Sequence, residues 1–456
     1  MNGQASKKNH IVWLIALPLL MLSALLAVWA LGQSHADTGS AGTLAYGQNA
    51  DGSGVVVQGM GTYKDTVLTI PESYGGLPVV EIASYAFVGN TALEALYLPD
   101  SIERIGEGAF KNCTGLVDIL LPEGLTALDS RAFEGCSSLS YLILPSTLSH
   151  IGNGAFKNCT GLFEVYFTEG NRTVGEEAFM GCSALYAVSF PETMTELGAN
   201  AFRNCKGLLS VQFGSALQKI GNGAFYACGA LQELTLPQGL FTIGDSAFAL
   251  CTSLKQIQFE STALGLGEWV FAGCSALESL TLPAGISKMG DYCFIACTSL
   301  QSVTLPADLQ KLPDGTFEGC TALSAITLPE GLQTVGDYAF YQCGALSLTL
   351  PQSFKRAGGS AFDGCTLSSF SYLGTESSYA SVSIATHNTA LQEAFDALFS
   401  ATIAHDVDGD GKVTIADVTA LLSMLSSSEA NIDLDGDGIC TISDITFLLT
   451  VLSSTV

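Results

Sequence analysis

Apolar and polar positions recur along the chain with a period of 23 residues. Phenylalanine marks this period, since it returns at the same interval and once more after 22 residues. The positions are Phe87, Phe110, Phe133, Phe156, Phe179, Phe202, Phe225, Phe248, Phe271, Phe294, Phe317, Phe340 and Phe362. A domain with loops of varied length would not keep this register, whereas an array of stacked repeats does. The pattern therefore predicts a solenoid.

One repeat, residues 109–122, shows the elements that we expect in all of them. Leu116, Ile119 and Leu121 have the spacing of a short strand whose apolar side chains point inward. Pro122 ends this strand because proline lacks the amide that a ladder needs. The residues that follow form an irregular or short helical return to the next phenylalanine. A single unit cannot bury its apolar face, so the strands stack in parallel into one continuous core.

The unit Ala-Phe-x-x-Cys-x-x-Leu-x-x-Ile-x-Leu-Pro resembles the BspA-type leucine-rich repeat of bacterial surface proteins. The resemblance covers residues 43–404 and implies a leucine-rich-repeat solenoid with a cap at each end. Residues 52–71 resemble the hairpin cap of that family. Residues 370–375 and 381–384, with the strand-like segment 401–403, resemble its terminal cap.

Twelve of the 14 cysteines occupy one slot, three residues after the repeat phenylalanine. They are Cys113, Cys136, Cys159, Cys182, Cys205, Cys228, Cys251, Cys274, Cys297, Cys320, Cys343 and Cys365. Side chains in equivalent slots of stacked repeats run parallel, whereas a disulfide needs converging ones. The spacing therefore favours a row of buried free thiols over scattered disulfides or a metal cluster.

Outward strand positions in the N-terminal half of the array are apolar or aromatic, and the equivalent positions further along are polar. The residues in question are Tyr97, Leu120, Ile143 and Tyr166, with Tyr141, Phe163 and Tyr186 at nearby outward positions. One interpretation is a patch that binds a protein or glycan ligand. The alternative is that such residues favour strands for their own sake.

The C-terminal segment contains two copies of the pattern D-x-D-x-D-G-x5-D, 27 residues apart. This is a variant of the EF-hand calcium loop, in which oxygens at positions 1, 3, 5, 7, 9 and 12 surround the ion. The predicted ligands are Asp406, Asp408, Asp410, Lys412 (carbonyl), Thr414 and Asp417, then Asp433, Asp435, Asp437, Ile439 (carbonyl), Thr441 and Asp444. We expect two Ca²⁺ ions whose binding is coupled to folding.

An amphipathic helix follows each loop, and the sequence shows no helix before either one. Residues 405–456 therefore resemble a type I dockerin, a module that binds cohesin modules of scaffold proteins in the cellulosomes of anaerobic bacteria. The recognition positions of that family correspond to Ile415, Ala416, Ile442 and Ser443. The basic residues common further along its helices are missing here, so we expect an apolar contact with a cohesin instead of a charge-steered one.

Residues 11–32 are uncharged and strongly apolar and follow two lysines. Residues 1–36 are consistent with a signal peptide ending in Ser34-His35-Ala36, or with an uncleaved membrane anchor. Either interpretation places the remainder outside the cytoplasm, as a secreted or cell-surface protein. The formal charge of −26 excludes nucleic acid as a partner, since DNA binding needs a basic face.

No catalytic motif is present in the sequence: there is no nucleophile elbow, phosphate loop or HExxH. We therefore predict a non-catalytic secreted component with a signal peptide (1–36), a repeat solenoid (37–404) and a dockerin (405–456). Two alternatives remain at this point. One is a membrane-anchored surface adhesin, and the other is an unrecognised carbohydrate-active enzyme or protease inhibitor.

Overall fold

The computed structural model describes residues 43–261, 263–405, 407–408, 413–427, 434 and 441–454. The predictions for residues 1–36 and for most positions of the two calcium loops lie outside these residues. Contacts within the chain divide it into two compact units, residues 1–193 and 194–456, which we call the N-terminal and C-terminal units. Each unit is described by itself.

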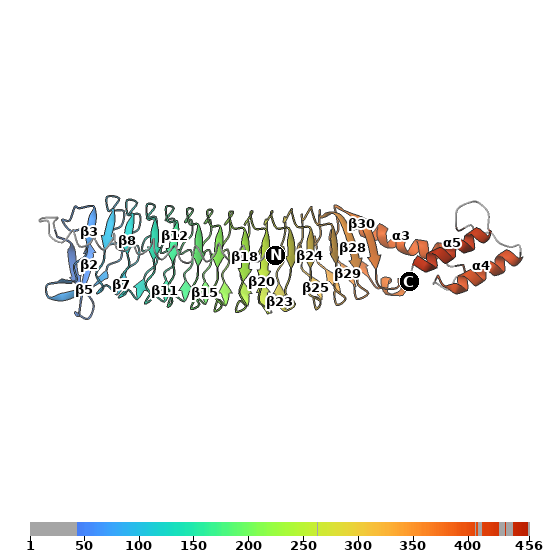
Figure 1. Ribbon diagram of the computed structural model, residues 1–456, viewed down its shortest axis with the longest axis horizontal. Helices are drawn as coiled ribbons and strands as arrows, with labels where there is room; N and C mark the ends of the chain where they lie inside the picture. The colour runs from blue at the N-terminus through green and yellow to red at the C-terminus, as the bar shows by residue number, and fades with distance from the viewer. Residues whose placement is uncertain are drawn as a thin grey trace, which may run out of the picture. The chain divides into compact units, whose positions relative to one another are not determined.

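Each repeat forms one coil that contains two short strands, and equivalent strands of successive coils pair in parallel (Figure 1). The first strand of each coil in the N-terminal unit belongs to the row β6 (Ala95–Tyr97), β8 (Asp118–Leu120), β10 (Tyr141–Ile143), β12 (Glu164–Tyr166) and β14 (Ala187–Ser189). The second strand belongs to the row β7 (Arg104–Ile105), β9 (Ala127–Leu128), β11 (His150–Ile151) and β13 (Thr173–Val174). The register advances by one 23-residue repeat per strand, as in the pair Ile143 and Tyr166.

The N-terminal end carries the expected hairpin. The strands of this cap are β1 (Ala45–Gln48), β2 (Val55–Gly59), β3 (Val67–Thr69), β4 (Ser73–Tyr74) and β5 (Leu77–Ile82). β1 pairs antiparallel with β2, and β2 then pairs in parallel with β5, the first strand of the regular stack. The hairpin thus covers the apolar face of the first coil, as an open array requires.

The C-terminal unit repeats the same two rows. Its first strands are β16 (Ser210–Gln212), β18 (Glu233–Leu236), β20 (Gln256–Phe259), β22 (Ser279–Thr281), β24 (Ser302–Thr304), β26 (Ala325–Thr327), β28 (Gly344–Leu350) and β30 (Cys365–Tyr372). Its second strands are β15 (Glu196–Leu197), β17 (Lys219–Ile220), β19 (Thr242–Ile243), β21 (Leu264–Leu266), β23 (Ile286–Met289), β25 (Lys311–Leu312), β27 (Thr334–Val335), β29 (Arg356–Ala357) and β31 (Ser383–Ile384). The helices of this unit are α2 (Glu376–Tyr379), α3 (Thr389–His405), α4 (Ile415–Ser427) and α5 (Ile442–Ser454).

The predicted phenylalanine row is the centre of the core. In the N-terminal unit, rings of adjacent coils stack with centroids 5.0 to 5.4 Å apart, beginning with Phe87 and Phe110. In the C-terminal unit the corresponding separations are 5.2 to 5.8 Å. The strand residues Leu116, Ile119 and Leu121 are buried, as predicted.

The cysteines form a second buried row, and the prediction of free thiols is confirmed for all that the structure describes. Thiols of this row donate to the phenylalanine carbonyl of the preceding coil, for example Cys113 Sγ to Phe87 O at 3.2 Å, whereas Cys293, outside the row, donates to Gly267 O. Burial raises the pKa of Cys113 to about 11 and that of Cys182 to about 12. The slot therefore selects a small group that can satisfy one inward-facing carbonyl.

Of the predicted irregular or short helical return path, the irregular form is found, and it includes a strand that was not predicted. It contains the second strand and a series of turns, and no helix is assigned within residues 43–261 and 263–375. Around Phe110 the backbone passes through left-handed conformations at Gly108 (φ 56°) and Asn112 (φ 60°). Because an α-helix cannot include such residues, the return becomes a chain of turns.

The terminal cap also differs in one segment. Residues 401–403 were predicted to be strand-like, but they belong to α3, which continues to His405. The first calcium loop is therefore preceded by a helix in the sequence, contrary to our prediction. Aromatic contacts explain this helix: Phe395 packs edge-on against Phe370 and Tyr372 of β30 and stacks on Tyr379. The helix shields the last apolar layer of the array.

Candidate ligand-binding surface and calcium loops

The first strands of the N-terminal unit present three rows of outward positions, which together we call the strand face. One row contains Tyr97, Leu120, Ile143, Tyr166 and Ser189, and the next contains Asp118, Tyr141, Glu164 and Ala187, beginning after the buried Ala95. The third row lies just before the strands and contains Glu94, Val117, Ser140, Phe163 and Tyr186. The coils of β8 and β10 meet through the amide of Ser140, which donates to the carbonyl of Val117 at 3.4 Å.

The seven predicted patch residues all lie on this face. Leu120, Phe163 and Tyr186 are 40%, 49% and 60% exposed, and the other four are partly exposed. Their outward position is confirmed, and their role in binding stays a prediction. Sequence reasoning missed Val117, which is as exposed as Leu120. It could have been found because it lies in the same row as Phe163.

Carboxylates interleave with the tyrosines, which sequence reasoning also missed. Tyr141 pairs with Glu164 in register, and Asp118 stands on its other side. Burial raises the pKa of Tyr141, and the charge of Asp118 adds to the effect. Burial likewise raises the pKa of Tyr166, with a further contribution from its hydrogen bond with Glu164. The phenols therefore stay neutral at physiological pH.

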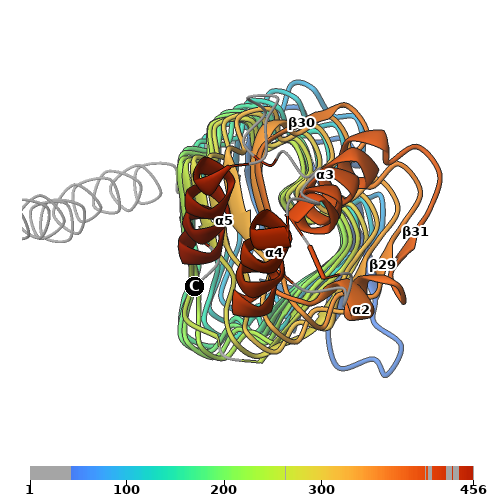
Figure 2. The same ribbon diagram turned by 90° about the vertical axis from the view of Figure 1, so that its right-hand side faces the viewer.

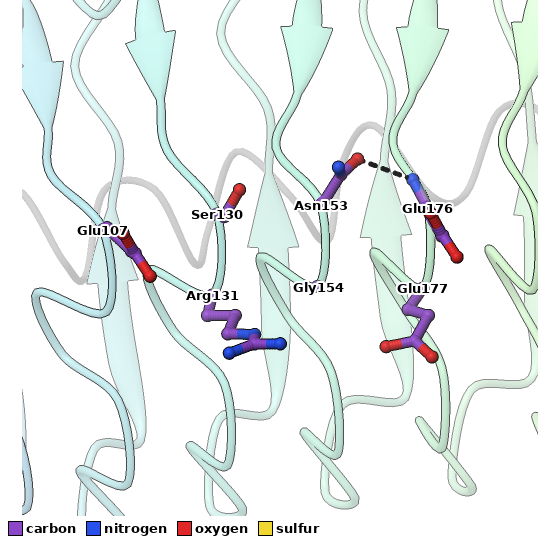
Figure 3. A pocket seen from close by; sticks show the side chains of 7 residues that line it. All are labelled: Glu107, Ser130, Arg131, Asn153, Gly154, Glu176 and Glu177. Atoms are coloured by element: carbon purple, nitrogen blue, oxygen red, sulfur yellow. Dashed lines mark hydrogen bonds between the residues drawn. The ribbon is translucent and has the colours of Figure 1, made fainter.

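A hollow of about 520 Å³ lies elsewhere in this unit, between successive coils (Figure 3). Its lining residues are Glu107, Ser130, Arg131, Asn153, Gly154, Glu176 and Glu177. Much of this polar surface is engaged within the fold. Asn153 accepts a hydrogen bond from the Glu176 amide at 2.8 Å, and Lys157 donates to Glu177 at 2.6 Å. Tyr85 donates to Glu107 at 2.5 Å. These contacts hold neighbouring coils together.

The described parts of the two calcium loops adopt the same arrangement. Asp417 accepts hydrogen bonds from the amides of Val407 (2.7 Å) and Thr414 (2.5 Å). Asp444 accepts them from Leu434 (2.7 Å) and Thr441 (2.6 Å), the equivalent loop positions. Both carboxylates are fully buried. Of the other predicted ligands, Asp406, Asp410, Lys412, Asp433, Asp435, Asp437 and Ile439 lie outside the described residues.

The threonines predicted at position 9 cap the helices. The hydroxyl of Thr414 accepts from the amide of Ala416 at 3.1 Å, and that of Thr441 accepts from Ser443 at 3.2 Å. This is the contact of an N-cap residue with the second residue of a helix. Each loop is therefore tied to the helix that follows it.

These residues fit a hard cation. Burial alone would raise the pKa of Asp417, but hydrogen bonds from the amides of Thr414, Asp408 and Val407 outweigh it, and the pKa is lowered. The carboxyl group is therefore ionised, and a carboxylate has about four lone-pair directions, so amide bonds and an ion can share it. Ionised oxygen ligands are what Ca²⁺ requires.

The two exit helices lie side by side (Figures 1 and 2) and pack through Val418, Leu421, Ile445 and Leu448. The predicted recognition residues are turned away from this core. Ile415 is 69% exposed and Ile442 is 75% exposed, and Ala416 and Ser443 are exposed beside them. Leu422 and Leu449 are also exposed, one helical turn or more further along. Each helix therefore presents a similar apolar strip.

Within the residues that the structure describes, no helix has both the length and the apolar character needed to cross a membrane.

One solved structure of similar fold supports the solenoid, and two others are reported with it. A leucine-rich repeat protein from Bacteroides ovatus is 25% identical with a TM-score of 0.56, over 72% of this chain and 92% of that one. A leucine-rich cell surface protein from Faecalibacterium prausnitzii is 25% identical with a TM-score of 0.43, over 76% and 98%. A leucine-rich repeat protein from T. pallidum is 28% identical with a TM-score of 0.34, over 53% and 91%. No curated protein matches the sequence.

The model of the BspA type leucine-rich repeat region (6 copies) matches residues 80–209, 172–294 and 251–368. These matches overlap and together span residues 80–368, which is more than half of the 456 residues. The same residues contain the phenylalanine and cysteine rows described above. The chain belongs to the BspA-type leucine-rich repeat family.

Proposed function

We propose that this protein is an exported, non-catalytic binding component. It captures a protein or glycan ligand on the strand face of its N-terminal unit and attaches through its C-terminal calcium loops to a cohesin. The family supports the first part of this proposal, because leucine-rich repeat proteins are generally non-catalytic binding proteins. BspA-type members are typically surface-exposed or secreted.

The observation that carries ligand capture is the strand face itself. Seven apolar or aromatic side chains lie in register over consecutive coils and are at least partly exposed. Tyrosine offers a large, rigid contact area with a polar end, which suits recognition of a partner. A contiguous exposed surface of this kind marks interaction sites in soluble proteins.

Docking rests on the duplicated arrangement at the C-terminus. Asp417 and Asp444 have equivalent hydrogen bonds, and Ile415 and Ile442 are the most exposed apolar residues of their helices. Calcium bound by the loops would neutralise the clustered carboxylates and hold each loop against its helix. The exposed isoleucine of each helix would then contact the apolar surface of a cohesin.

Ligand capture is tested by replacing Tyr97, Tyr141 and Tyr166 with serine in the full chain. Probes are arrays of oligosaccharides and of peptides, with circular dichroism as the measure of folding. Truncation of a central tyrosine costs more than about 1 kcal/mol in many interfaces, so we expect a loss of about 100-fold for the triple variant. The control replaces Thr281, Thr304 and Thr327 of the C-terminal unit with serine. Capture that survives in the tyrosine variant contradicts the proposal.

Docking is tested with a panel of cohesins in millimolar calcium and in chelator. We expect binding in calcium alone, and we expect its loss when Ile415 and Ile442 are both replaced by glutamate. Calorimetry should still show calcium binding by that variant, because neither side chain is a predicted ligand. The double variant Asp417→Asn, Asp444→Asn should lose both calcium and cohesin. Cohesin binding that ignores chelation would defeat the docking part of the proposal.

A further inference from the structure

The charge of the strand face narrows the choice of ligand. Its acidic residues are Glu94, Asp118 and Glu164, and its three rows contain no lysine or arginine between residues 94 and 189. None of the ion pairs among the described residues involves these three carboxylates. On this face, therefore, no lysine or arginine side chain would compete with a positively charged ligand for these three carboxylates.

Bases of the same unit are engaged elsewhere. Arg104 contacts Asp129 at 2.6 Å, Lys111 contacts Glu134 at 2.9 Å, and Lys157 contacts Glu177 at 2.6 Å. These pairs involve the second strands and the turns, not the strand face. The ion pairs among the described residues of this unit thus lie away from the strand face, and Glu94, Asp118 and Glu164 belong to none of them.

We infer that the ligand of the strand face is an extended polypeptide segment with regularly spaced lysine or arginine residues. This inference rests on the proposed function, namely that the face captures a ligand at all. An ammonium or guanidinium group is attracted both to the face of a tyrosine ring and to a carboxylate. Tyr141 stands between Asp118 and Glu164 on successive coils, so both attractions act at one place.

The spacing of the carboxylates on the strand face specifies the spacing of the positive charges that we expect on the ligand. Asp118 and Glu164 lie two coils apart in one row, about 9.6 Å at about 4.8 Å per strand. A polyproline II helix places every third residue on the same side at intervals of about 9.3 Å. A segment in this conformation, laid along the row with a basic residue at every third position, would present one cation to each carboxylate and pass over Tyr141.

The experiment measures binding of the full chain to fluorescent peptides of equal length and equal positive charge. In one peptide, lysines are separated by two prolines; in the other, the lysines form a single block. The uncharged sugar cellohexaose is the third probe. We expect the periodic peptide to bind most tightly and its affinity to fall as salt is raised, because exposed charge pairs are screened.

Variants assign the effect to the face. The double variant Asp118→Asn, Glu164→Gln keeps the shape of both side chains, and we expect it to weaken binding of the periodic peptide about tenfold. Glu233→Gln is the matched control, since Glu233 occupies the equivalent position of β18 in the C-terminal unit. We expect this variant to bind the periodic peptide with unchanged affinity.

Other outcomes overturn the inference. Binding of cellohexaose that needs the tyrosines and ignores the Asp118, Glu164 double variant would identify a neutral glycan as the ligand and leave the proposed function intact. Equal affinity for the two peptides would overturn the inference that the ligand has a basic residue at every third position. If the probes bind equally well after the triple tyrosine substitution, the proposal that this face captures a ligand is wrong.

Discussion

The strand faces of the two units differ although their cores are the same. In the N-terminal unit the outward row reads Tyr97, Leu120, Ile143 and Tyr166, and the equivalent row of the C-terminal unit is mainly Thr and Gln, as at Thr235, Gln258, Thr281 and Thr304. Behind both rows lie stacked phenylalanines and buried thiols. The inward positions determine the coil, so the outward positions are free to vary, and the proposed ligand specificity would reside there.

The largest expected effect concerns the shared core. Replacing Phe156 in the N-terminal unit or Phe294 in the C-terminal unit with alanine removes a fully buried ring from a stack. We expect each substitution to lower the free energy of unfolding by about 3–5 kcal/mol, through lost burial and the cavity left behind. Urea unfolding of each variant measures this. A much smaller loss at one of the two sites would show that the cores are not equivalent.

The strand faces can be made alike by grafting. On β18, β20 and β22, Glu233, Gln256 and Ser279 lie together at the positions equivalent to Asp118, Tyr141 and Glu164. The double variant Gln256→Tyr, Ser279→Glu recreates the acid–tyrosine–acid series on the C-terminal unit. We expect a second binding site for the periodic basic peptide, seen as a doubled stoichiometry in calorimetry. Surface substitutions of this kind alter stability by about 0.5 kcal/mol or less.

An unchanged stoichiometry in that variant would indicate that the N-terminal site needs more than three residues, for example Phe163 and Tyr186. A combined variant that also replaces Gln301 of the C-terminal unit with tyrosine then separates the two explanations, because Gln301 holds the position of Tyr186 relative to the grafted residues.

A smaller effect, equal in both units, is expected from the thiols. Burial raises the pKa of Cys113 to about 11 and that of Cys251 to about 12, above the ordinary value of about 9. A raised pKa in the folded state means that stability is fully present below pH 9 and is lost as the pH rises toward 11 or 12. By pH 10 the loss is about 1 kcal/mol for each such thiol.

Urea unfolding at pH 8 and at pH 10, in the presence of a reductant, measures this loss. Cys113→Ala and Cys251→Ala should each reduce the pH dependence by a similar amount. A pH dependence that is unaffected by either substitution would mean that other groups are responsible for it.

Much of this fold could be predicted from the sequence because the repeat multiplies a weak signal. One Leu-x-x-Ile-x-Leu segment could be a strand or part of a helix, but the regular spacing of Phe87 and the twelve phenylalanines that follow it indicates a repeat array. The second strand was missed because a pair such as Arg104–Ile105 is too short to show any alternation. The helix at residues 401–403 was missed because its β-branched residues favour strands locally, whereas contacts of Phe395 with the last coil decide the outcome.

The candidate surface was predicted in part. Exposed aromatic residues are visible along the sequence, but Asp118 and Glu164 resemble any other solvent-exposed acids until the register places them beside Tyr141. For the two aspartate-rich loops the pattern predicts calcium ligands, and the structure adds what the pattern could not, namely the amide hydrogen bonds that hold Asp417 and Asp444. Those bonds depend on backbone geometry, which residue types alone do not specify.

The backbone hydrogen bonds between neighbouring coils join residues about one repeat apart in the sequence, as from the amide of Phe110 to the carbonyl of Ala132 on the following coil. A duplicated 23-residue repeat could therefore be added to the array and form the same bonds with its neighbours, because each coil contacts only the coils next to it. A copy inserted between Asp118 and Glu164 would move these carboxylates apart by one strand step, so the number of repeats there would set the charge spacing of the ligand that we infer.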